Sequence, residues 1–300
     1  PPEAVILAAT DSAKKSHING VVGYGGGSSM DVAKLIALLA NPAQTQNITE
    51  IYGVNNITGK RLPLIQVPTT AGTGSEVTAV AIVTTGETTK MGVVSPILLA
   101  DAAILDAELT IGLPAHVTAA TGIDAMVHAI ESFTSAIKKN PYSDMLAREA
   151  LRLLDQNLQT AIHDKKNLIA RENMLLGAMM AGQAFANSPV AAVHALAYPL
   201  GGHFHIPHGL SNSLVLIEVM RFNLLHVIDL YAELFKTLEP NSVGNNEELA
   251  MKLIARLECH IIESGLPRKL NEIKFKDHSG ELQPIQKEHL PALAVDAMKQ

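Results

Sequence analysis

The chain has 300 residues, of which 47% are hydrophobic and 17% are charged, against roughly 25% charged residues in an average soluble domain. Its formal net charge of −6 gives no sign of the basic surface that binds nucleic acid or an anionic membrane. A single cysteine, Cys259, excludes a disulfide framework and a thiolate metal cluster. It is typical of a reducing compartment, so we expect a cytoplasmic protein. The 12 histidines stand out, because four of them fall within residues 191–209.

The sequence predicts neither a secretory signal nor a membrane span. The first residues lack a basic segment followed by an apolar run. Residues 173–217 form a stretch of 45 residues without Asp, Glu, Lys or Arg. Polar residues and four histidines interrupt this stretch well short of the roughly 20 apolar residues that a membrane span needs. The stretch is therefore typical of helices buried inside a soluble protein.

The first third of the chain alternates short apolar runs with helical patterns. Runs bounded by glycine or proline predict buried parallel strands at 20–24 and 64–67, with further strands at 79–84 and 103–105. Helical spacing follows at 30–39, and a helix over 11–17 precedes the first strand. This alternation is typical of βαβ units and an α/β fold.

After Leu113-Pro114 the pattern changes to long helices, which we expect at about 115–136, 141–164, 168–187, 190–202, 210–234 and 246–265. The chain is therefore predicted to divide near Pro114 into an α/β part, residues 1–113, and an all-helical part, residues 114–300. Residues 266–300 hold three prolines and mixed charge, and they predict no definite element.

A glycine-rich loop, GYGGGSSMD at residues 23–31, follows a predicted strand and opens a predicted helix. Consecutive glycines let backbone N–H groups approach an anion, and the helix N-terminus adds about half a positive charge. Ser28 replaces the last glycine of the G-x-G-x-x-G fingerprint. The alternative is a tight turn with Ser28 or Ser29 as N-cap, but three glycines in a row exceed what a turn needs. We interpret the loop as a phosphate-binding site.

A second loop, PTTAGTGSEVT at residues 68–78, follows another predicted strand. Its glycines and small hydroxyl residues can line a ribose and a pyrophosphate. They are equally typical of a plain loop with a capping box from Thr73 to Glu76, and both interpretations stay open here. Because both loops follow predicted parallel strands, they fall where open α/β sheets bind ligands.

Aspartate and histidine residues in the helical part predict a metal site. Asp124 and His128 lie four residues apart, so a helix places both on one face, although a surface pair has the same spacing. Glu131, a turn further on, either orients His128 or faces solvent. We expect the helix that contains His194 to break at Gly201-Gly202 and the chain to return, which brings His208 towards His194.

One carboxylate and three imidazoles are a suitable set of ligands for a divalent metal. Since no thiolate is present, Fe²⁺ or Zn²⁺ is favoured, with Mn²⁺, Co²⁺ or Ni²⁺ as other occupants. The predicted ligands are Asp124, His128, His194 and His208.

Four motifs occur in the order found in iron-containing (group III) alcohol dehydrogenases, which the sequence resembles over residues 5–265. They are GGGSSMDVAK (25–34), PTTAGTGSEVT (68–78), TGIDAMVHAIES (121–132) and HALAYPLGGHFHIPHG (194–209). The resemblance implies an N-terminal dinucleotide-binding α/β domain, similar to that of dehydroquinate synthase, and an all-α metal-binding domain. It implies Fe²⁺ or Zn²⁺ and NAD or NADP in the cleft between them. It also implies a small alcohol or aldehyde as substrate and a homodimer or higher homo-oligomer.

The resemblance assigns roles to individual residues of this sequence. The metal ligands of the family fall on the same four residues as those predicted above. The family's contacts with the cofactor fall on both loops, on a lysine beside the nicotinamide ribose and on a side chain near that ribose. In this sequence they are Gly26, Gly27 and Ser28 in the first loop, Thr69, Thr70 and Thr78 in the second, Lys90, and Leu109. We expect the proton to leave through water with Tyr198 or His205 assisting.

The sequence departs from the family pattern at both ends and at one site residue. Family members usually have a further segment ahead of residue 1, which includes an acidic residue that selects NAD over NADP. They also continue beyond residue 300, and residues 274–281 look atypical. Many members have a second histidine where this chain has Tyr198, although a subgroup that includes hydroxyacid–oxoacid transhydrogenases also has tyrosine.

The expected reaction is hydride transfer between an alcohol carbon and the nicotinamide. Two alternatives on the same scaffold are a hydroxyacid–oxoacid transhydrogenase-like enzyme and a dehydroquinate synthase-like enzyme, in which the cofactor is a transient oxidant. A third alternative is an inactive, truncated chain that only binds the cofactor.

Overall fold

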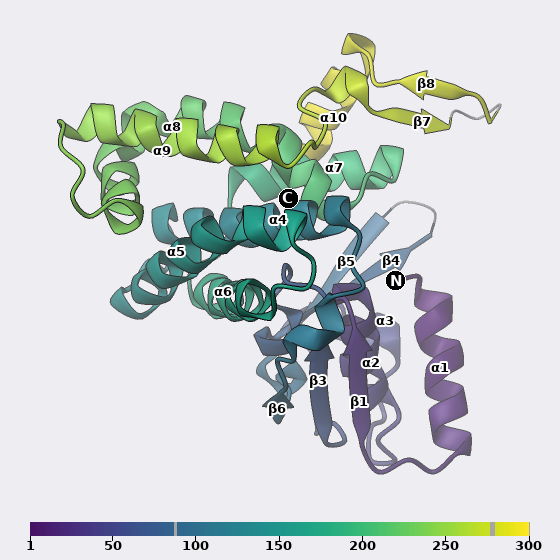
Figure 1. The fold of residues 1–300 in the computed structure, drawn as a ribbon. Coiled ribbons are helices and arrows are strands. Elements are labelled where there is room, and N and C mark those ends of the chain that lie inside the picture. Colours follow the sequence, from purple (N-terminus) through teal and green to yellow (C-terminus); the bar gives the residue numbers. More distant parts are fainter. Residues whose placement is uncertain (87–88, 277–279, 300) are drawn as a thin grey trace.

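The computed structural model describes residues 1–86, 89–276 and 280–299, and it has an α/β N-terminal part followed by a helical C-terminal part (Figure 1). This confirms the predicted fold class. The change of architecture falls between a short 3₁₀ turn, η3 (Ala107–Thr110), and the first long helix, α4 (Ala115–Thr134). Pro114 is the residue that precedes this helix.

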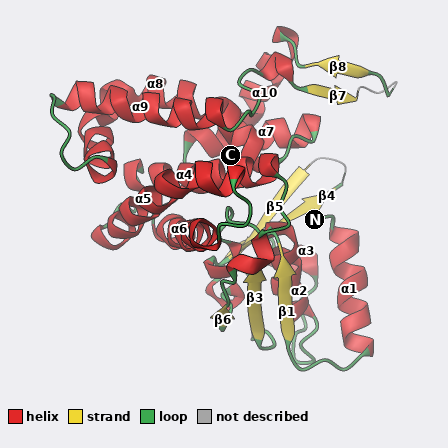
Figure 2. Cartoon of the chain, viewed as in Figure 1, coloured by secondary structure: helices red, strands yellow, loops and turns green. Residues whose placement is uncertain are grey.

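A parallel sheet lies in the α/β part, with strand order β1-β3-β6 (Figure 2). Its strands are β1 (Val21–Gly25), β3 (Leu64–Pro68) and β6 (Ala102–Ala103). Gly25 at the end of β1 is paired with Pro68 at the end of β3. The Thr69 backbone N–H, just beyond β3, donates to the Gly25 carbonyl at 2.9 Å. The two loops that follow these strands therefore begin side by side.

A second sheet, of order β2-β5-β4, differs from the prediction. Its strands are β2 (Gly53–Val54), β4 (Val80–Thr85) and β5 (Thr89–Val94). The strand expected at 79–84 exists, but it pairs antiparallel with β5 and is not paired with the parallel sheet. The polar start of β5, Thr89-Lys90, is exposed, so this strand lacks the alternation of apolar residues that would have predicted it.

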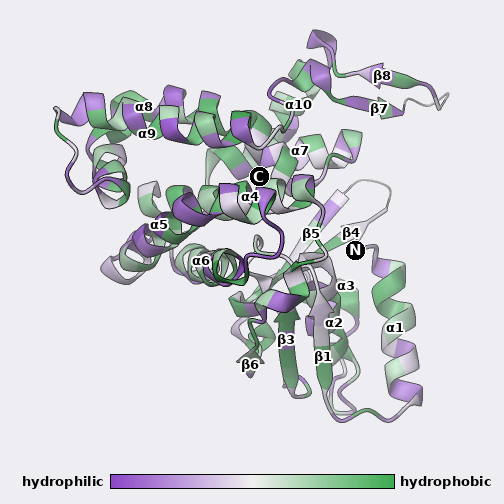
Figure 3. Cartoon of the chain, viewed as in Figure 1, coloured by the Kyte–Doolittle hydropathy of each residue, from purple (hydrophilic) through white to green (hydrophobic). Residues whose placement is uncertain are grey.

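Helices cover the α/β part as α1 (Glu3–Lys15), α2 (Gly27–Leu39) and α3 (Ile48–Ile51). The predicted helix at 11–17 is thus only the end of a longer one that begins at Glu3. Helix α2 buries Met30, Leu35 and Leu38 completely, and the two leucines belong to the apolar core of this part. Hydrophobic residues run along β1 and β3, against which α2 packs (Figure 3).

The long helices of the C-terminal part agree with the predicted ones to within a few residues. They are α4, α5 (Pro141–His163), α6 (Leu168–Asn187), α7 (Ala192–Phe204), α8 (His208–Leu238) and α9 (Asn246–Glu263). One local prediction is wrong, because α7 continues through Gly201 and Gly202. The chain leaves the helix at His205, which takes the left-handed conformation with φ 55°. Helix α8 is kinked at Val227.

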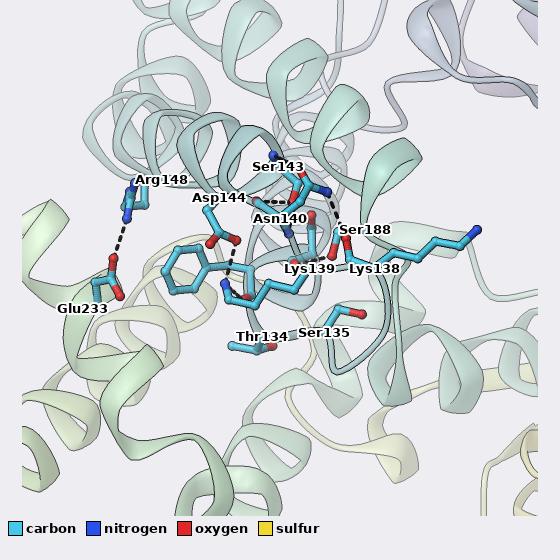
Figure 4. Close-up of polar contacts among 12 residues, drawn as sticks. Thr134, Ser135, Lys138, Lys139, Asn140, Ser143, Asp144, Arg148, Ser188 and Glu233 are labelled. Carbon is cyan, nitrogen blue, oxygen red and sulfur yellow. Dashed lines mark hydrogen bonds and ion pairs between the residues drawn. The ribbon is translucent and has the colours of Figure 1, made fainter.

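Polar contacts hold the turn between α4 and α5 in place (Figure 4). Asn140 caps α5 through a reciprocal capping box with Ser143. The Lys139 ammonium lies 2.6 Å from an Asp144 carboxylate oxygen. The Ser188 hydroxyl, just after α6, donates to the Ser132 carbonyl of α4 at 2.8 Å. These contacts fix the end of α4, the helix on which the predicted metal site depends.

The largest apolar core lies among α4, α5, α6, α8 and α9, and α4 is buried from Thr118 to Phe133 except for Thr121. Beyond α9 the chain forms a hairpin of β7 (Lys274–Lys276) and β8 (Leu282–Pro284) and a last helix, α10 (Leu290–Ala297). Within the described residues, no helix combines the length and the apolar character that crossing a bilayer requires.

Candidate metal centre and cofactor cleft

Four predicted ligands from three helices come together in the structure. Asp124 and His128 lie on α4, His194 lies on α7, and His208 is the first residue of α8. One donor atom from each residue lies within 4.8 Å of the others. Asp124 Oδ1 is 3.6, 3.9 and 4.0 Å from the Nε2 atoms of His208, His194 and His128. Tetrahedral bonds of about 2.0–2.2 Å to one metal would place donor atoms roughly 3–4 Å apart, so the set fits a divalent cation.

A glycine allows α8 to begin this close to α4. A Cβ atom at Gly209 would lie 2.3 Å from the Ala120 carbonyl oxygen, a separation that real side chains do not reach. Any other residue at Gly209 would therefore push the start of α8, and with it His208, away from Asp124. The left-handed His205 and the fixed φ of Pro207 turn the chain between α7 and α8.

Burial and the neighbouring groups set the charge of Asp124, His128 and His208. Asp124, His128 and His194 are 2%, 4% and 2% exposed. Burial lowers the pKa of His128 to about 4 and also lowers the pKa of His208. Burial alone would raise the pKa of Asp124, but the facing imidazoles and the Asn212 amide outweigh it and lower that pKa. At neutral pH the site thus has an anionic carboxylate beside neutral His128 and His208, the forms that bind metals.

Two further buried residues contact the ligands, and their roles depend on tertiary contacts. Glu131 lies 2.6 Å from His194 Nδ1 and makes no hydrogen bond with His128, so both predicted roles for it are wrong. The Asn212 amide, one turn after His208 in α8, donates to Asp124 Oδ1 and faces His194 Nε2 at 3.3 Å. Asn212 follows His208 by four residues on the same helix, and this spacing was the sequence signal that could have identified it.

A cleft with a cavity of about 230 Å³ opens beside the four ligands and is lined by both parts of the chain. The α/β part contributes Gly27 and Ser28 from α2 and Thr78 from the second loop. The helical part contributes His128, His194 and His208 together with the apolar residues Phe185 and Val190. The site is therefore placed where a ligand can contact the metal ligands and both loops at once.

The first loop has the features of an anion site. Its helix, α2, begins after Gly26, which makes no side-chain cap, and the first turn has no acidic residue. The alternative in which Ser28 or Ser29 is the N-cap is thus wrong, since both lie inside the helix. A Cβ at Gly27 would lie 2.8 Å from Thr73, so a glycine is needed where the two loops meet. Uncapped backbone N–H groups at a helix N-terminus favour a phosphate.

The second loop does not form the capping box that the sequence allowed. Gly74, not Thr73, precedes the short turn η1 (Ser75–Val77), and the Thr73 hydroxyl accepts from the Ser75 N–H at 3.3 Å. Glu76 is buried instead, and burial raises its pKa to about 7. The loop is therefore held by tertiary contacts and leaves Thr73, Ser75 and Thr78 on the wall of the cleft.

A buried lysine, Lys34 of α2, supports this second loop and was not predicted. Its ammonium donates to Ser75 Oγ at 2.9 Å, to Thr78 Oγ1 at 3.3 Å and to the Val80 carbonyl at 2.7 Å. Asp31, which lies 3.6 Å away, completes the group. A lysine inside the apolar run at 30–39, three residues after an aspartate, was the signal in the sequence.

The remaining predicted residues differ in how close they come to the cleft. Lys90 lines it although the residue as a whole is exposed, and desolvation of its ammonium at the cleft lowers the pKa of the lysine. Tyr198 also lines it and stacks on His208 with ring centroids 5.7 Å apart, and burial raises the pKa of Tyr198 to about 12. His205 is exposed and is not among the residues that line the cleft, so the structure does not bring it to the metal ligands.

Four predicted cofactor contacts are not among the residues that line this cleft: Gly26, Thr69, Thr70 and Leu109. A Cβ at Gly26 would be 3.5 Å from the Thr70 hydroxyl, so the two loops also approach each other at these two residues. The Thr69 N–H donates a hydrogen bond to the Gly25 carbonyl at the end of β1. Leu109 is half-buried in η3 and is not one of the residues that line the cleft.

Comparison with known proteins identifies the family. Residues 1–107 match the family model described as iron-containing alcohol dehydrogenase. Residues 118–300 match the model described as the C-terminal part of the Fe-containing alcohol dehydrogenase family. Long-chain-alcohol dehydrogenase 1 of Geobacillus thermodenitrificans is 42% identical over 272 residues, which are 90% of this chain and 68% of that protein. The 1,3-propanediol dehydrogenase of Citrobacter freundii is 37% identical over 88% of this chain and 68% of its own length.

Solved structures agree with this result. A crystal structure of 1,3-propanediol oxidoreductase has a TM-score of 0.92 at 33% identity and covers 100% of this chain and 76% of its own. The sulfoacetaldehyde reductase of Bifidobacterium kashiwanohense, solved in complex with NAD⁺, has a TM-score of 0.82 at 31% identity. The match covers 99% of this chain and 74% of that protein's chain. The chain spans about two thirds of the length of the curated relatives above. It belongs to the iron-containing alcohol dehydrogenase family.

Proposed function

We propose that the chain is a metal-dependent alcohol dehydrogenase that transfers a hydride between a small alcohol, or a hydroxy acid, and NAD(P). The observation that carries this proposal is the convergence of Asp124, His128, His194 and His208 on a cleft that the glycine-rich loop also lines. Relatives named as long-chain-alcohol, 1,3-propanediol and NAD-dependent methanol dehydrogenases support the reaction class.

The four ligands would hold Fe²⁺, with Zn²⁺ as the alternative, and the metal would supply Lewis-acid polarisation of the substrate oxygen. The side chain of His208 is 33% exposed and lies on the cleft side, so the ligand set is open towards the substrate. The other three ligands have side chains no more than 5% exposed, which keeps bulk water from the far side of the centre.

Residues of the cleft wall would orient the substrate and exclude water. Phe185 stacks on His128 with centroids 4.6 Å apart, and Val190 adds a second apolar surface. A low local dielectric strengthens each polar contact made there. Burial raises the pKa of Tyr198 to about 12, so its hydroxyl stays protonated and would act only as a relay, which takes the substrate proton while it gives its own to water. His205 is left without this role because of its position.

The cofactor would lie between the two loops. The N-terminus of α2, at Gly26, Gly27 and Ser28, would hold the pyrophosphate, and Thr78 and Lys90 would contact the nicotinamide half. NAD is the form bound by the sulfoacetaldehyde reductase of similar fold, and it is the form proposed here, with NADP as the alternative.

Domain roles, location and assembly follow from the same interpretation. Residues 1–113 are proposed as the cofactor-binding domain and residues 114–300 as the metal-binding domain, because the two loops and the four ligands divide in this way. The single cysteine supports a cytoplasmic location. A homodimer or higher homo-oligomer stays a prediction from the family resemblance.

The test is reduction of NAD⁺ and NADP⁺ across a panel of alcohols and hydroxy acids, with Fe²⁺ or Zn²⁺ supplied. We expect chelation to abolish NAD(P)H formation and added metal to restore it. Asp124→Ala should lower turnover at least about 100-fold, because a lost Lewis acid is worth several kcal/mol. Unchanged turnover in this variant would contradict the metal assignment.

The same assay separates the alternatives. A dehydroquinate synthase-like enzyme or a transhydrogenase would regenerate its cofactor and give no net NAD(P)H. A chain that only binds the cofactor would bind NAD⁺ in calorimetry without turning over any alcohol of the panel.

A further inference from the structure

We propose that Glu131 is the positioning residue of the metal centre. It fixes the tautomer of His194 that leaves Nε2 free to bind metal, and it caps the helix that carries this ligand. The inference rests on the proposed metal centre, and it concerns a residue outside the four ligands.

The contacts of Glu131 reach from α4 to the start of α7. The residue is 4% exposed, so its carboxyl group has little access to water. One carboxylate oxygen, Oε2, lies 2.6 Å from His194 Nδ1 and accepts from the Ala191 N–H at 3.0 Å. The other, Oε1, accepts from the Val193 N–H at 2.6 Å. Both oxygens are therefore used by one short segment, residues 191–194.

The carboxylate determines which ring nitrogen of His194 carries the proton. Both carboxylate oxygens already accept hydrogen bonds from backbone N–H groups, and Nδ1 is assigned as the donor in the 2.6 Å contact. A ring protonated only at Nδ1 then has a lone pair on Nε2, the atom that faces Asp124 Oδ1 at 3.9 Å inside the ligand cluster. The amide nitrogen of Asn212 faces the same Nε2 at 3.3 Å, which also fits an unprotonated nitrogen.

The same carboxylate provides the cap that α7 lacks. Helix α7 follows Ala191, which makes no side-chain cap, and it has no acidic residue in its first turn. Unpaired N–H groups at a helix start need acceptors and favour negative charge. Because Glu131 belongs to α4, this cap ties the first turn of α7, with His194 on it, to the helix that holds Asp124 and His128.

This role is specific to the ligand that comes from another helix. His128 shares α4 with Asp124, and the helix alone sets their spacing. Among the described residues, its Nδ1 has no hydrogen-bond partner. His194 needs an outer contact to hold its ring, and loss of such contacts typically costs about 10–100-fold in metal affinity.

The decisive variant is Glu131→Gln, which keeps the shape of the side chain but replaces one acceptor oxygen by an NH₂ donor. If the amide oxygen stays on Val193, the NH₂ group faces Nδ1 and favours the proton on Nε2, where it blocks the metal. If the amide turns, the NH₂ group meets the Val193 N–H, and the cap is lost.

We expect the Kd for Zn²⁺, measured by competition with a chromophoric chelator, to rise about 10–100-fold in Glu131→Gln. Glu131→Asp, which keeps an acceptor carboxylate, should bind Zn²⁺ more tightly than Glu131→Gln. The matched control is Asp155→Asn on α5, since Asp155 is also buried and holds a histidine, His260, at 2.7 Å but contacts no metal ligand. It should lower the melting temperature without changing the Kd.

A second readout keeps the test independent of folding defects and of metal binding. In ¹⁵N-histidine-labelled wild-type protein without metal, the His194 ring should show protonated Nδ1, assigned by comparison with His194→Gln. Protonated Nε2 in the wild type, or a Kd for Glu131→Gln within twofold of the wild type, would overturn the proposal. A wild type that binds no metal would instead overturn the proposed function, while the tautomer of His194 still tests Glu131.

Discussion

Glu76 is a buried acid on the second loop whose charge should make stability depend on pH. It is 4% exposed, and burial raises its pKa from 4.5 to about 7, although its own backbone N–H and Lys34 oppose this shift. The folded chain therefore binds a proton at Glu76 more tightly than the unfolded chain does. The stability that this proton contributes is fully present below pH 4.5 and is lost as the pH rises through about 7.

We expect wild-type protein to lose roughly 3 kcal/mol of unfolding free energy relative to Glu76→Gln across this interval. The amide of the variant stays neutral, so its curve lacks this component while other groups titrate in both proteins. Urea denaturation at a series of pH values, with the same metal content, measures the difference. If the unfolding free energies of wild type and Glu76→Gln changed equally with pH between pH 5 and pH 8, the result would contradict a raised pKa at Glu76.

At the scale of elements, Lys34 joins α2 to the second loop and to β4. Its ammonium has no exposed surface, and its acceptors lie on Ser75, Thr78 and Val80. Lys34→Met would remove these bonds and leave Asp31 without its cation, and breaking a buried pair typically costs about 3–5 kcal/mol. We expect a loss of this size in the free energy of unfolding, measured by urea denaturation.

The matched control for this loss is Lys15→Met at the exposed end of α1, where a change within about 0.5 kcal/mol is expected. If Lys34→Met were as stable as Lys15→Met, the three hydrogen bonds of Lys34 would make no net contribution to the free energy of unfolding. The second loop would then be held by its apolar contacts and by the close approach of Gly74 to Gly182 on α6.

Elements that depend on neighbouring residues could be predicted from the sequence. Strands β1 and β3 are short apolar runs that end at Gly25 and Pro68, and their parallel pairing follows from the helix between them. Asp124 and His128 are four residues apart on one helix, so their common face follows from the helical period. His194 and His208 were found through residue type, since few other side chains bind metal without thiolates.

Elements that depend on distant partners could not be predicted in the same way. Strand β5 begins with exposed polar residues and is a strand because β4 and β2 pair with it. Helix α7 passes Gly201-Gly202, since packing on α8 and α10 outweighs the low helix propensity of glycine. Glu131 has the spacing of a partner for His128, and only the docking of α7 directs it to His194.

At the scale of the whole molecule, the four ligands connect three helices at the boundary between the two parts of the chain. Asp124 and His128 come from α4, His194 from α7 and His208 from the start of α8. An ion that binds only the folded chain stabilises it by mass action. At a free concentration of 100 times its Kd, the gain is about 2.7 kcal/mol.

Metal removal should therefore lower the melting temperature of the wild-type protein, and added Zn²⁺ should restore it. For a chain of 300 residues, about 2.7 kcal/mol corresponds to a change of roughly 4 °C, measured by scanning calorimetry with and without chelator. The control is Asp124→Ala, whose melting temperature should not respond to the metal, whatever its absolute value. An equal response in the variant would place the stabilising metal elsewhere, because the remaining imidazoles alone would lack the anionic ligand that faces all three of them.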